Sequence, residues 1–498
     1  MKKQLTYRWL ASLLAGIVIA AGIASFPVRA SAELPYRTYT SDDKGKLVDV
    51  QAAYVPDTYL YVFLEGDIPG WAADAPPTLN QPDDLFLDQR NHLYIADTGN
   101  NRIIELGADR QPVRVYGTEE GEGSLSAPRG IFVTEDGMLY VADSKNMRIA
   151  VFDQGGRFIK QYNKPETDFL PESFLFEPIK LVVDKRGFIY VATHNGYQGL
   201  LLLDDIGVFQ GFYGANRTER TFTETLKRMF YTEQQLSKEI MKIPGSVSNV
   251  TLGPDGFLYT TSVSVKQGQV KKLDFFGRDM LGERIASLAI DTMNLDVAVG
   301  QTGSMSVLDA GMGEIRQYNA LGELLFVFSS KDNGYNKVGL LKQPAAIAIE
   351  PSGTLNVLEK TLGVIQRFRP TEFAGLVHEA NEKFMAGEYE SSAGPWKEVL
   401  HLNTKFNMAQ LGLAKASFKQ RDWEQARYHY RSAGDKVGYS DSFWYVRLEW
   451  MNANASGLLT TASALLALGL AGRFIWIRRK EGRKRDAGGD SIETGAGK

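Results

Sequence analysis

Residues 82–106, PDDLFLDQRNHLYIADTGNNRIIEL, and residues 128–152, PRGIFVTEDGMLYVADSKNMRIAVF, decide the fold of this chain. Both run from a proline through an alternating apolar segment and a polar turn to Leu-Tyr-Ile/Val-Ala-Asp, and then into another apolar segment. Alternation with a period of two is typical of β-strands with one buried face. The two stretches are therefore copies of one unit built from short strands.

Four further copies of the unit follow. The landmark residues of the six copies are separated by 46, 50, 69, 48 and 50 residues; they are Tyr94, Tyr140, Tyr190, Tyr259, Val307 and Val357. Apart from the third interval, this is the period of a propeller blade. An outer strand would bring most units to four strands, at Val113–Tyr116, Phe158–Tyr162, Val208–Tyr213, Met280–Leu281 and Leu324–Phe328. The sequence predicts a mainly β fold, a six-bladed β-propeller over residues 33–370.

The last copy lacks a fourth strand of its own. Residues 46–64 precede the first copy and also alternate, so we expect one of their strands to complete the last blade and close the ring. The long third interval holds an insertion, residues 216–243, with apolar residues at helical spacing. We expect one or two helices there, on a loop that either carries function or covers one face of the propeller.

Two copies share a turn motif, whose members are Asp97, Asn100, Arg102, Asp143, Asn146 and Arg148. Each motif is preceded by Leu-Tyr-Ile/Val-Ala, and together these stretches resemble the NHL-repeat propeller family. The resemblance covers roughly residues 46–370, with the motif present in two blades. Asx turns and arginine–carboxylate pairs account for these residue types, so the six are predicted to be structural.

After residue 370 the pattern becomes helical. Small and aromatic residues recur at a separation of 34 residues, in the pairs Ala380/Ala414, Phe384/Phe418, Gly387/Arg421, Tyr389/Trp423, Trp396/Tyr430 and Val399/Ala433. Residues 373–451 therefore resemble tetratricopeptide (TPR) repeats, which implies two helical hairpins, a capping helix, and a peptide or protein segment as partner. Because two repeats are few for independent stability, we expect them to pack on the propeller or on a partner.

Both ends carry membrane-related patterns. Residues 1–32 combine three cations, an apolar run and Ala30-Ser31-Ala32, the layout of a secretory signal peptide, with an uncleaved anchor as the alternative. Residues 457–477 are apolar and long enough to span a bilayer core. Residues 478–498 begin with six cations against one acid, and such segments stay on the cytoplasmic side. We expect a single-pass protein of the cell membrane, with an extracytoplasmic bulk and a cytoplasmic tail.

The composition excludes several classes of protein. The 498 residues carry a net charge of −3, so no overall basic field draws the chain to nucleic acid. No cysteine is present, which excludes disulfides, thiolate zinc sites and cysteine nucleophiles. The five histidines do not cluster along the sequence, and those in the propeller, His92 and His194, are predicted to be solvated turn residues. Since phosphate-loop, dinucleotide, zinc-protease and nucleophile-elbow motifs are also missing, we expect neither an enzyme nor a cofactor.

Polar residues open several of the predicted innermost strands. Alignment of the copies places six residues around the channel: Asp84, Gly130, Lys180, Asn249, Asp296 and Ala346. The oxygens of Asp84, Asn249 and Asp296 are suitable for a divalent cation, but Lys180 in the same ring would repel it. These four polar residues are candidates for a channel-rim site that binds a small polar ligand such as a sugar; a water-filled channel is the alternative.

The expected function is binding. Propeller faces and TPR grooves are interaction surfaces, so we predict a scaffold or accessory protein whose partner is another protein of the membrane or envelope, with a carbohydrate-uptake complex as one setting. A carbohydrate or peptide ligand is a further expectation. The alternatives are a lactonase-like or glycan-acting hydrolase that uses the channel ring, and a sugar-binding sensor, which would need a membrane partner because its tail of about 20 residues is too short for an output domain.

Overall fold

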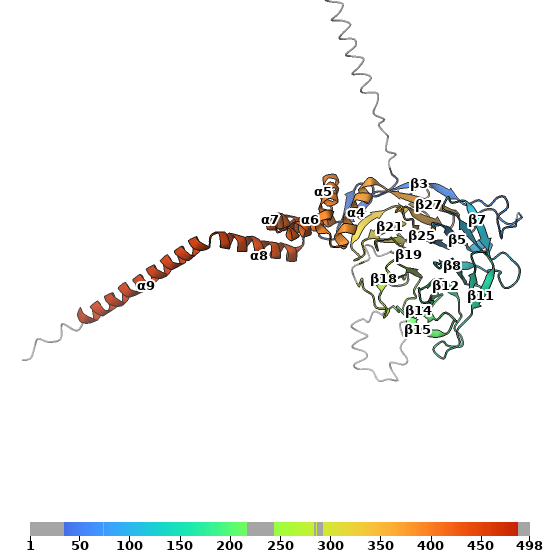
Figure 1. Cartoon of the computed structure of the whole chain (residues 1–498), viewed down its shortest axis with the longest axis horizontal. Helices are drawn as coiled ribbons and strands as arrows, with labels where there is room; N and C mark the ends of the chain where they lie inside the picture. The colour runs from blue at the N-terminus through green and yellow to red at the C-terminus, as the bar shows by residue number, and fades with distance from the viewer. Residues whose placement is uncertain (1–33, 73, 217–243, 283–284, 286–291, 487–498) are drawn as a thin grey trace, which may run out of the picture.

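A six-bladed β-propeller is followed by a series of six helices, the last of them long and apolar (Figure 1). The structure is a computed structural model that describes residues 34–486, except 73, 217–243, 283–284 and 286–291. The predicted signal peptide and nearly all of the predicted insertion lie outside the described residues.

Blades 1 to 3 are regular four-stranded antiparallel sheets. Blade 1 consists of β4 (Asp84–Leu87), β5 (Leu93–Asp97), β6 (Arg102–Leu106) and β7 (Pro112–Tyr116), with the short 3₁₀ helix η1 (Thr98–Asn100) between β5 and β6. Blade 2 consists of β8 (Pro128–Val133), β9 (Leu139–Asp143), β10 (Arg148–Phe152) and β11 (Phe158–Tyr162). Blade 3 consists of β12 (Pro178–Val183), β13 (Ile189–Thr193), β14 (Leu200–Leu203) and β15 (Phe209–Tyr213).

Among the described residues, blade 4 has three strands, β16 (Asn249–Leu252), β17 (Leu258–Thr261) and β18 (Val270–Leu273). The prediction of an outer strand at Met280–Leu281 was wrong, because these two residues are not in a strand and the residue before them, Asp279, makes an isolated bridge with Leu273. The carboxylate of Asp279 accepts hydrogen bonds from the N–H groups of Leu281 and Gly282, both at 3.0 Å. An Asx-type turn of this kind bends the chain away from β18 and ends the pairing.

Blades 5 and 6 recruit N-terminal strands. Blade 5 contains β19 (Asn294–Val299), β20 (Met305–Asp309), β21 (Glu314–Tyr318) and β22 (Leu324–Phe328), and is extended by β1 (Thr38–Ser41) and β2 (Leu47–Val50). Blade 6 contains β25 (Pro344–Ile349), β26 (Leu355–Glu359) and β27 (Val364–Pro370), with β3 (Tyr54–Tyr61) as its outer strand. The antiparallel β27–β3 pairing confirms that an N-terminal strand closes the ring. A short parallel pair, β23 (Ser330–Lys331) and β24 (Leu340–Leu341), links the two blades.

The first four of the six helices pack in chain order, each on the next, and α7 packs on α8. They are α4 (Glu372–Met385), α5 (Tyr389–Leu402), α6 (Asn407–Lys419), α7 (Trp423–Ser432), α8 (Lys436–Ala453) and α9 (Ala455–Asp486). A buried cluster is continuous from blades 5 and 6 into α4, α5 and α6: Phe326, Phe328 and Phe368 of the propeller lie in the same core as Phe373 and Trp396. The helices therefore pack on the propeller, one of the two expected arrangements.

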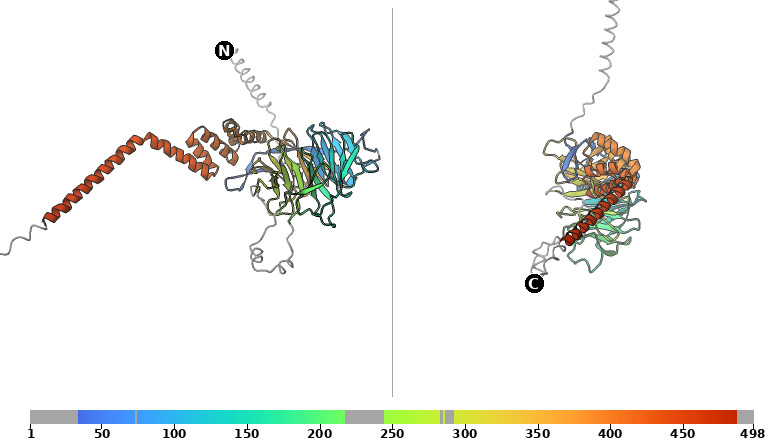
Figure 2. Two further views of the ribbon diagram at one scale, coloured as in Figure 1. Left: turned by 60° about the horizontal axis from the view of Figure 1, so that its bottom comes forward. Right: turned by 90° about the vertical axis from the view of Figure 1, so that its left-hand side faces the viewer.

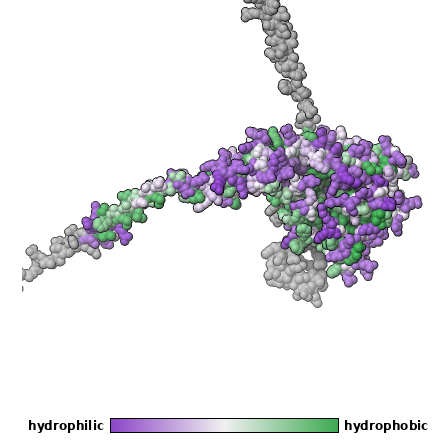
Figure 3. Space-filling model, viewed as in Figure 1, coloured by the Kyte–Doolittle hydropathy of each residue, from purple (hydrophilic) through white to green (hydrophobic). Residues whose placement is uncertain are grey.

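The last helix, α9, is a candidate membrane span over Ala455–Glu481, with a mean hydropathy of 1.7 in its most apolar window. The predicted span, residues 457–477, lies within it. Its apolar surface projects away from the rest of the chain (Figure 3), and the chain bends between α8 and α9 (Figure 2). By length and composition this helix can cross a bilayer core.

Candidate functional site

The innermost strands form a closed ring. The strands β4, β8, β12, β16, β19 and β25 each contact the next, and β25 contacts β4. Each of the six aligned residues pairs with a residue near the end of the second strand of its blade, as Asp84 pairs with Ala96 and Asp296 with Leu308. The four polar candidates, Asp84, Lys180, Asn249 and Asp296, are thereby brought to one end of the channel, which we call the channel ring.

The first half of the channel ring is centred on Asp84, which is buried. Its Oδ1 accepts hydrogen bonds from the Leu85 N–H at 2.8 Å and from the Nζ of Lys180, and its Oδ2 accepts one from the Ile131 N–H at 2.8 Å. A carboxylate of blade 1 therefore binds the backbone of blade 2 and the ammonium group of blade 3. The blade 2 residue between them is Gly130, where a Cβ atom would lie 2.7 Å from the Ile179 carbonyl oxygen.

The second half repeats the arrangement at Asp296, which is also buried. Its Oδ1 accepts from the Val297 N–H at 2.7 Å and from the side-chain amide of Asn249, and its Oδ2 accepts from the Ile347 N–H at 2.8 Å. Asp296 of blade 5 thus joins blades 4 and 6. The oxygen Oδ1 of Asn249 is buried with no protein partner, so it is free to accept a hydrogen bond from a water molecule or a ligand hydroxyl.

Two carboxylates face one ammonium group in the channel ring. Burial raises the pKa of Asp84 to about 6 against the opposing effect of Lys180. Burial also disfavours the charged form of Lys180, but Asp84 and Asp296 together raise its pKa above the ordinary value. Asp84 and Lys180 are therefore an ion pair at neutral pH. Among the described residues, no group of three or more His, Asp or Glu is placed to hold a metal ion.

The NHL-like motif forms a buried network in blades 1 and 2. In blade 1, Asp97 Oδ2 accepts from Arg102 Nε at 2.7 Å and from Asn100 Nδ2 at 2.8 Å, and Asp97 Oδ1 accepts from the Asn80 N–H at 2.7 Å. Asp143, Asn146 and Arg148 repeat these contacts in blade 2, where Asp143 binds the Ser126 N–H at 2.7 Å. Each motif holds the segment that enters its own blade, and all the polar groups of Asp97 and Asp143 are used inside the protein.

Blades 5 and 6 carry equivalent contacts that the motif search missed. The Asp309 carboxylate accepts from the Met293 N–H at 2.9 Å and lies 2.9 Å from an Arg316 Nη2, although the arginine is two positions later than in blade 1. In blade 6, Glu359 accepts from the Lys342 and Gln343 N–H groups, both at 2.9 Å. An acidic residue at the end of the second strand was the signal available in the sequence.

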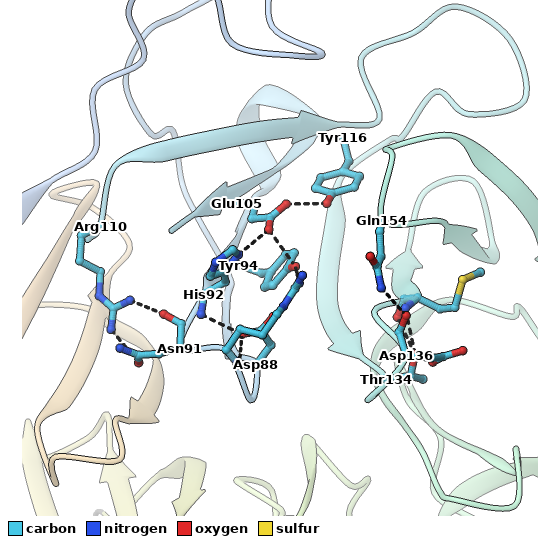
Figure 4. A network of polar contacts seen from close by, with 12 residues as sticks. Asp88, Asn91, His92, Tyr94, Glu105, Arg110, Tyr116, Thr134, Asp136 and Gln154 are labelled. Carbon is cyan, nitrogen blue, oxygen red and sulfur yellow. Dashed lines mark hydrogen bonds and ion pairs between the residues drawn. The ribbon is translucent and has the colours of Figure 1, made fainter. Parts of the chain in front are cut away.

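A second polar cluster lies in blade 1 around Glu105 (Figure 4). The Glu105 carboxylate is 5% exposed and contacts His92 Nδ1 at 2.7 Å, the Tyr94 hydroxyl at 3.1 Å and the Tyr116 hydroxyl at 2.6 Å. The prediction of a solvated His92 was therefore wrong, because its ring is paired with a buried carboxylate; His194 is exposed as expected. Burial first, and then the interaction with Glu105, raises the pKa of both tyrosines, which keeps them as neutral donors.

A groove opens between the β1–β2 hairpin and the helices. Its volume is about 720 Å³. The hairpin contributes Asp42, Asp43, Lys46 and Val48, and the helices and their connections contribute Leu400, Thr404, Lys405, Asn407, Gln410, Tyr428, His429 and Ser432. At one end the hairpin is attached to the helices, because Asn403 Nδ2 donates to the Asp49 carbonyl oxygen at 3.2 Å. We call this the hairpin–helix groove; no sequence pattern pointed to it.

Comparison with known proteins supports the repeat. A family model described as NHL repeat matches residues 125–152. Comparison with curated proteins finds no match. Among solved structures, a streptogramin B lyase is 14% identical with a TM-score of 0.41, over 68% of this chain and 93% of that chain. A catalytically inactive virginiamycin B lyase from Staphylococcus aureus with quinupristin is 13% identical, with a TM-score of 0.40 over 68% of this chain and 97% of that one.

A gluconolactonase from Xanthomonas campestris is 12% identical, with a TM-score of 0.39 over 64% of this chain and 98% of that one. TM-scores and identities this low carry no argument about activity. The comparisons therefore support an NHL repeat at residues 125–152, and the propeller fold follows from the strand pairing of the chain itself.

Proposed function

We propose that this chain is a membrane-anchored, extracytoplasmic binding protein that acts as a scaffold or accessory subunit for another protein of the membrane or envelope. The observation that carries the proposal is the buried core that continues from blades 5 and 6 into α4–α6. A helical module that shares its core with the propeller presents its surfaces in a fixed orientation. Preorganised surfaces bind partners at a lower entropic cost than mobile ones.

The hairpin–helix groove is the proposed partner site. It combines Asp42, Asp43 and Lys46 on the hairpin with Lys405 on the helical side, and its volume of about 720 Å³ lies in the range of ligand-binding clefts. A polypeptide segment with charges of both signs fits such a surface. The TPR-like spacing of the helices favours a peptide or protein segment, and a component of a carbohydrate-uptake complex is one candidate partner.

In this proposal α9 crosses the cell membrane once. The cationic residues that follow the apolar part of α9 favour a cytoplasmic tail, and the signal-peptide pattern of residues 1–32 favours an extracytoplasmic propeller.

The hydrolase and sugar-sensor alternatives both use the channel ring. The pairing of Lys180 with Asp84 disfavours a divalent cation there, because the ammonium group occupies the oxygen that the metal would need. The free oxygen of Asn249 gives a sugar one acceptor. Metal analysis of the purified protein, with a screen of sugars and lactones against wild type and Asp296→Ala, tests these alternatives.

The proposal is tested by photo-crosslinking in cells. A photoreactive phenylalanine at Lys405, in the groove, is compared with one at Lys185, whose side chain is 83% exposed on blade 3. We expect one membrane or envelope protein to be captured at position 405 and not at 185. Equal capture at both positions, or none, would contradict the groove as the partner site.

A further inference from the structure

One face of α8 has no partner among the described residues. On its other side α8 packs against α7 through Ser442, which is buried, and Gly438, where a Cβ atom would lie 2.4 Å from the Tyr430 ring. The free face carries Val437, 72% exposed, and Trp444, 57% exposed. These two are seven residues apart, so they lie on one side of the helix. Large apolar side chains gathered in this way indicate an interaction surface.

Charged side chains of both signs border this apolar face. The guanidinium groups of Arg427 and Arg447 lie 5.8 and 5.7 Å from the centre of the Phe443 ring. Arg431 and Lys436 lie nearby in sequence on α7 and α8. Of the acids on these helices, Glu424 is paired with Arg427 at 2.6 Å, and Glu449 accepts from the Trp423 indole N–H at 2.8 Å. Asp441 is exposed on α8, between Val437 and Trp444 in the sequence. The surface is therefore aromatic, with charges of both signs.

The C-terminal end of α8 adjoins the candidate membrane span. Helix α8 ends at Ala453 and α9 begins at Ala455, so Trp450, 58% exposed, precedes the span by five residues. At a rise of about 1.5 Å per residue this is roughly 8 Å along the helix, within the headgroup region. Tryptophan, tyrosine and arginine are the side chains that favour this region, where an apolar body and a polar tip are both satisfied.

We propose that the free face of α8 lies in the headgroup region of the membrane that α9 crosses. This inference rests on the membrane anchoring given in the proposed function. Because α4–α8 pack in series and α4–α6 share a core with the propeller, seating α8 on the lipid surface would set the orientation of the propeller and of the hairpin–helix groove above the membrane.

The experiment uses the natural absence of cysteine. Full-length single-cysteine variants Trp444→Cys and Trp450→Cys carry a nitroxide spin label, in nanodiscs of phosphatidylcholine and phosphatidylglycerol. Power saturation compares the accessibility of the label to oxygen, which partitions into lipid, with its accessibility to a water-soluble nickel chelate. Leu466→Cys, in α9, is the membrane control, and Phe275→Cys, 77% exposed on blade 4, is the aqueous control.

We expect the labels at 444 and 450 to give oxygen-to-nickel ratios between those of 275 and 466. A ratio equal to that of 275 would overturn the proposal, and so would exclusion of both reagents, which would indicate a protein partner or a second copy on α8. If the label at 466 is itself aqueous, the anchoring in the proposed function fails. If 466 is embedded and 444 and 450 are aqueous, only the inference about α8 fails.

Discussion

Asp84 and Lys180 form a buried ion pair that passes over Gly130, so that blade 1 is tied to blade 3 across the backbone of blade 2. The same carboxylate binds the Ile131 N–H of blade 2 at 2.8 Å. Three of the six blades are thus joined at one aspartate. This relationship gives the charged residues of the channel a structural role, which is to join blades.

Lys180→Met removes one partner of this pair and leaves a buried, unpaired carboxylate. We expect the free energy of unfolding to fall by about 3 kcal/mol, the usual cost of breaking a buried pair. Thermal or denaturant unfolding measures this loss. The double variant Asp84→Asn/Lys180→Met should recover most of the loss. Lys185→Met removes an exposed pair with Glu135 and should cost less than about 1 kcal/mol. Equal effects of the two lysine variants would show that the channel pair is solvated.

Arg316→Met tests whether blade 5 uses the contacts of the NHL-like blades. Arg316 and Arg102 are 2% and 1% exposed, and each faces a fully buried aspartate. Both Arg102→Met and Arg316→Met should therefore lower stability by about 3 kcal/mol or more. Arg90→Met, at a pair whose arginine is 49% exposed, is the control and should change little. A neutral Arg316→Met would mean that blade 5 is held together differently.

Gly412→Ala tests the packing of the helices. A Cβ atom at Gly412 would lie 2.2 Å from the Trp396 indole nitrogen, so the bulky ring must move, at a cost of about 1–3 kcal/mol. Gly394 lies in α5 with no atom within 4 Å of its built Cβ position. Gly394→Ala should instead stabilise by about 0.5–1 kcal/mol through helix propensity. Chemical unfolding of the two variants should show shifts of opposite sign; shifts of the same sign would contradict the packing.

His378 makes the junction of propeller and helices sensitive to acid. Its ring lies partly buried beside the Tyr54 hydroxyl, with 3.4 Å between Nε2 and the hydroxyl oxygen, and desolvation lowers its pKa to about 4. Because the unfolded state takes up this proton first, near pH 6.5, His378 contributes a loss of stability as the pH falls from about 6.5 to 4, up to about 3 kcal/mol. Asp84 has the opposite effect on stability, because its pKa is raised to about 6 in the folded protein. Its contribution to stability therefore increases as the pH falls from about 6 to the ordinary pKa of an aspartate.

The effect of His378 is therefore measured by comparing the pH dependence of stability between the wild type and a variant. His378→Gln should lose less stability than the wild type between pH 7 and 4.5, whereas His401→Gln, at an exposed position, should follow the wild type. Parallel curves for wild type and His378→Gln would show that the histidine is protonated in the folded state.

Much of the fold could be predicted from periodicity alone. The blade period, the strand from the N-terminal segment and the helices after residue 370 all depend on local alternation and spacing. Periodicity did not give the register in blades 5 and 6. The position of Tyr94 is occupied there by Ser306 and Asn356. The predicted landmarks, Val307 and Val357, are one residue later. These strands replace the tyrosine with a small or polar residue, so the landmark was displaced by one position.

The candidate site was only partly predictable. Alignment of the repeats was sufficient to bring Asp84, Lys180, Asn249 and Asp296 together, because radial repetition places equivalent residues around one axis. The pairing among them depends on side-chain reach and on the missing Cβ of Gly130, which no spacing rule describes. The hairpin–helix groove joins residues 42–48 to residues 400–432, and such long-range contacts leave no periodic signal.

The most direct test of the binding function is the co-purification of a partner from detergent-solubilised membranes with the tagged full-length chain. Point variants are preferable to deletion of residues 373–451, because deletion would expose the core that the helices share with blades 5 and 6. We predict that one membrane or envelope protein co-purifies in a constant ratio with wild type and with Lys185→Glu, and is lost with Thr404→Arg/Lys405→Glu. Absence of any partner with the wild type, or equal recovery with the groove variant, would contradict the account.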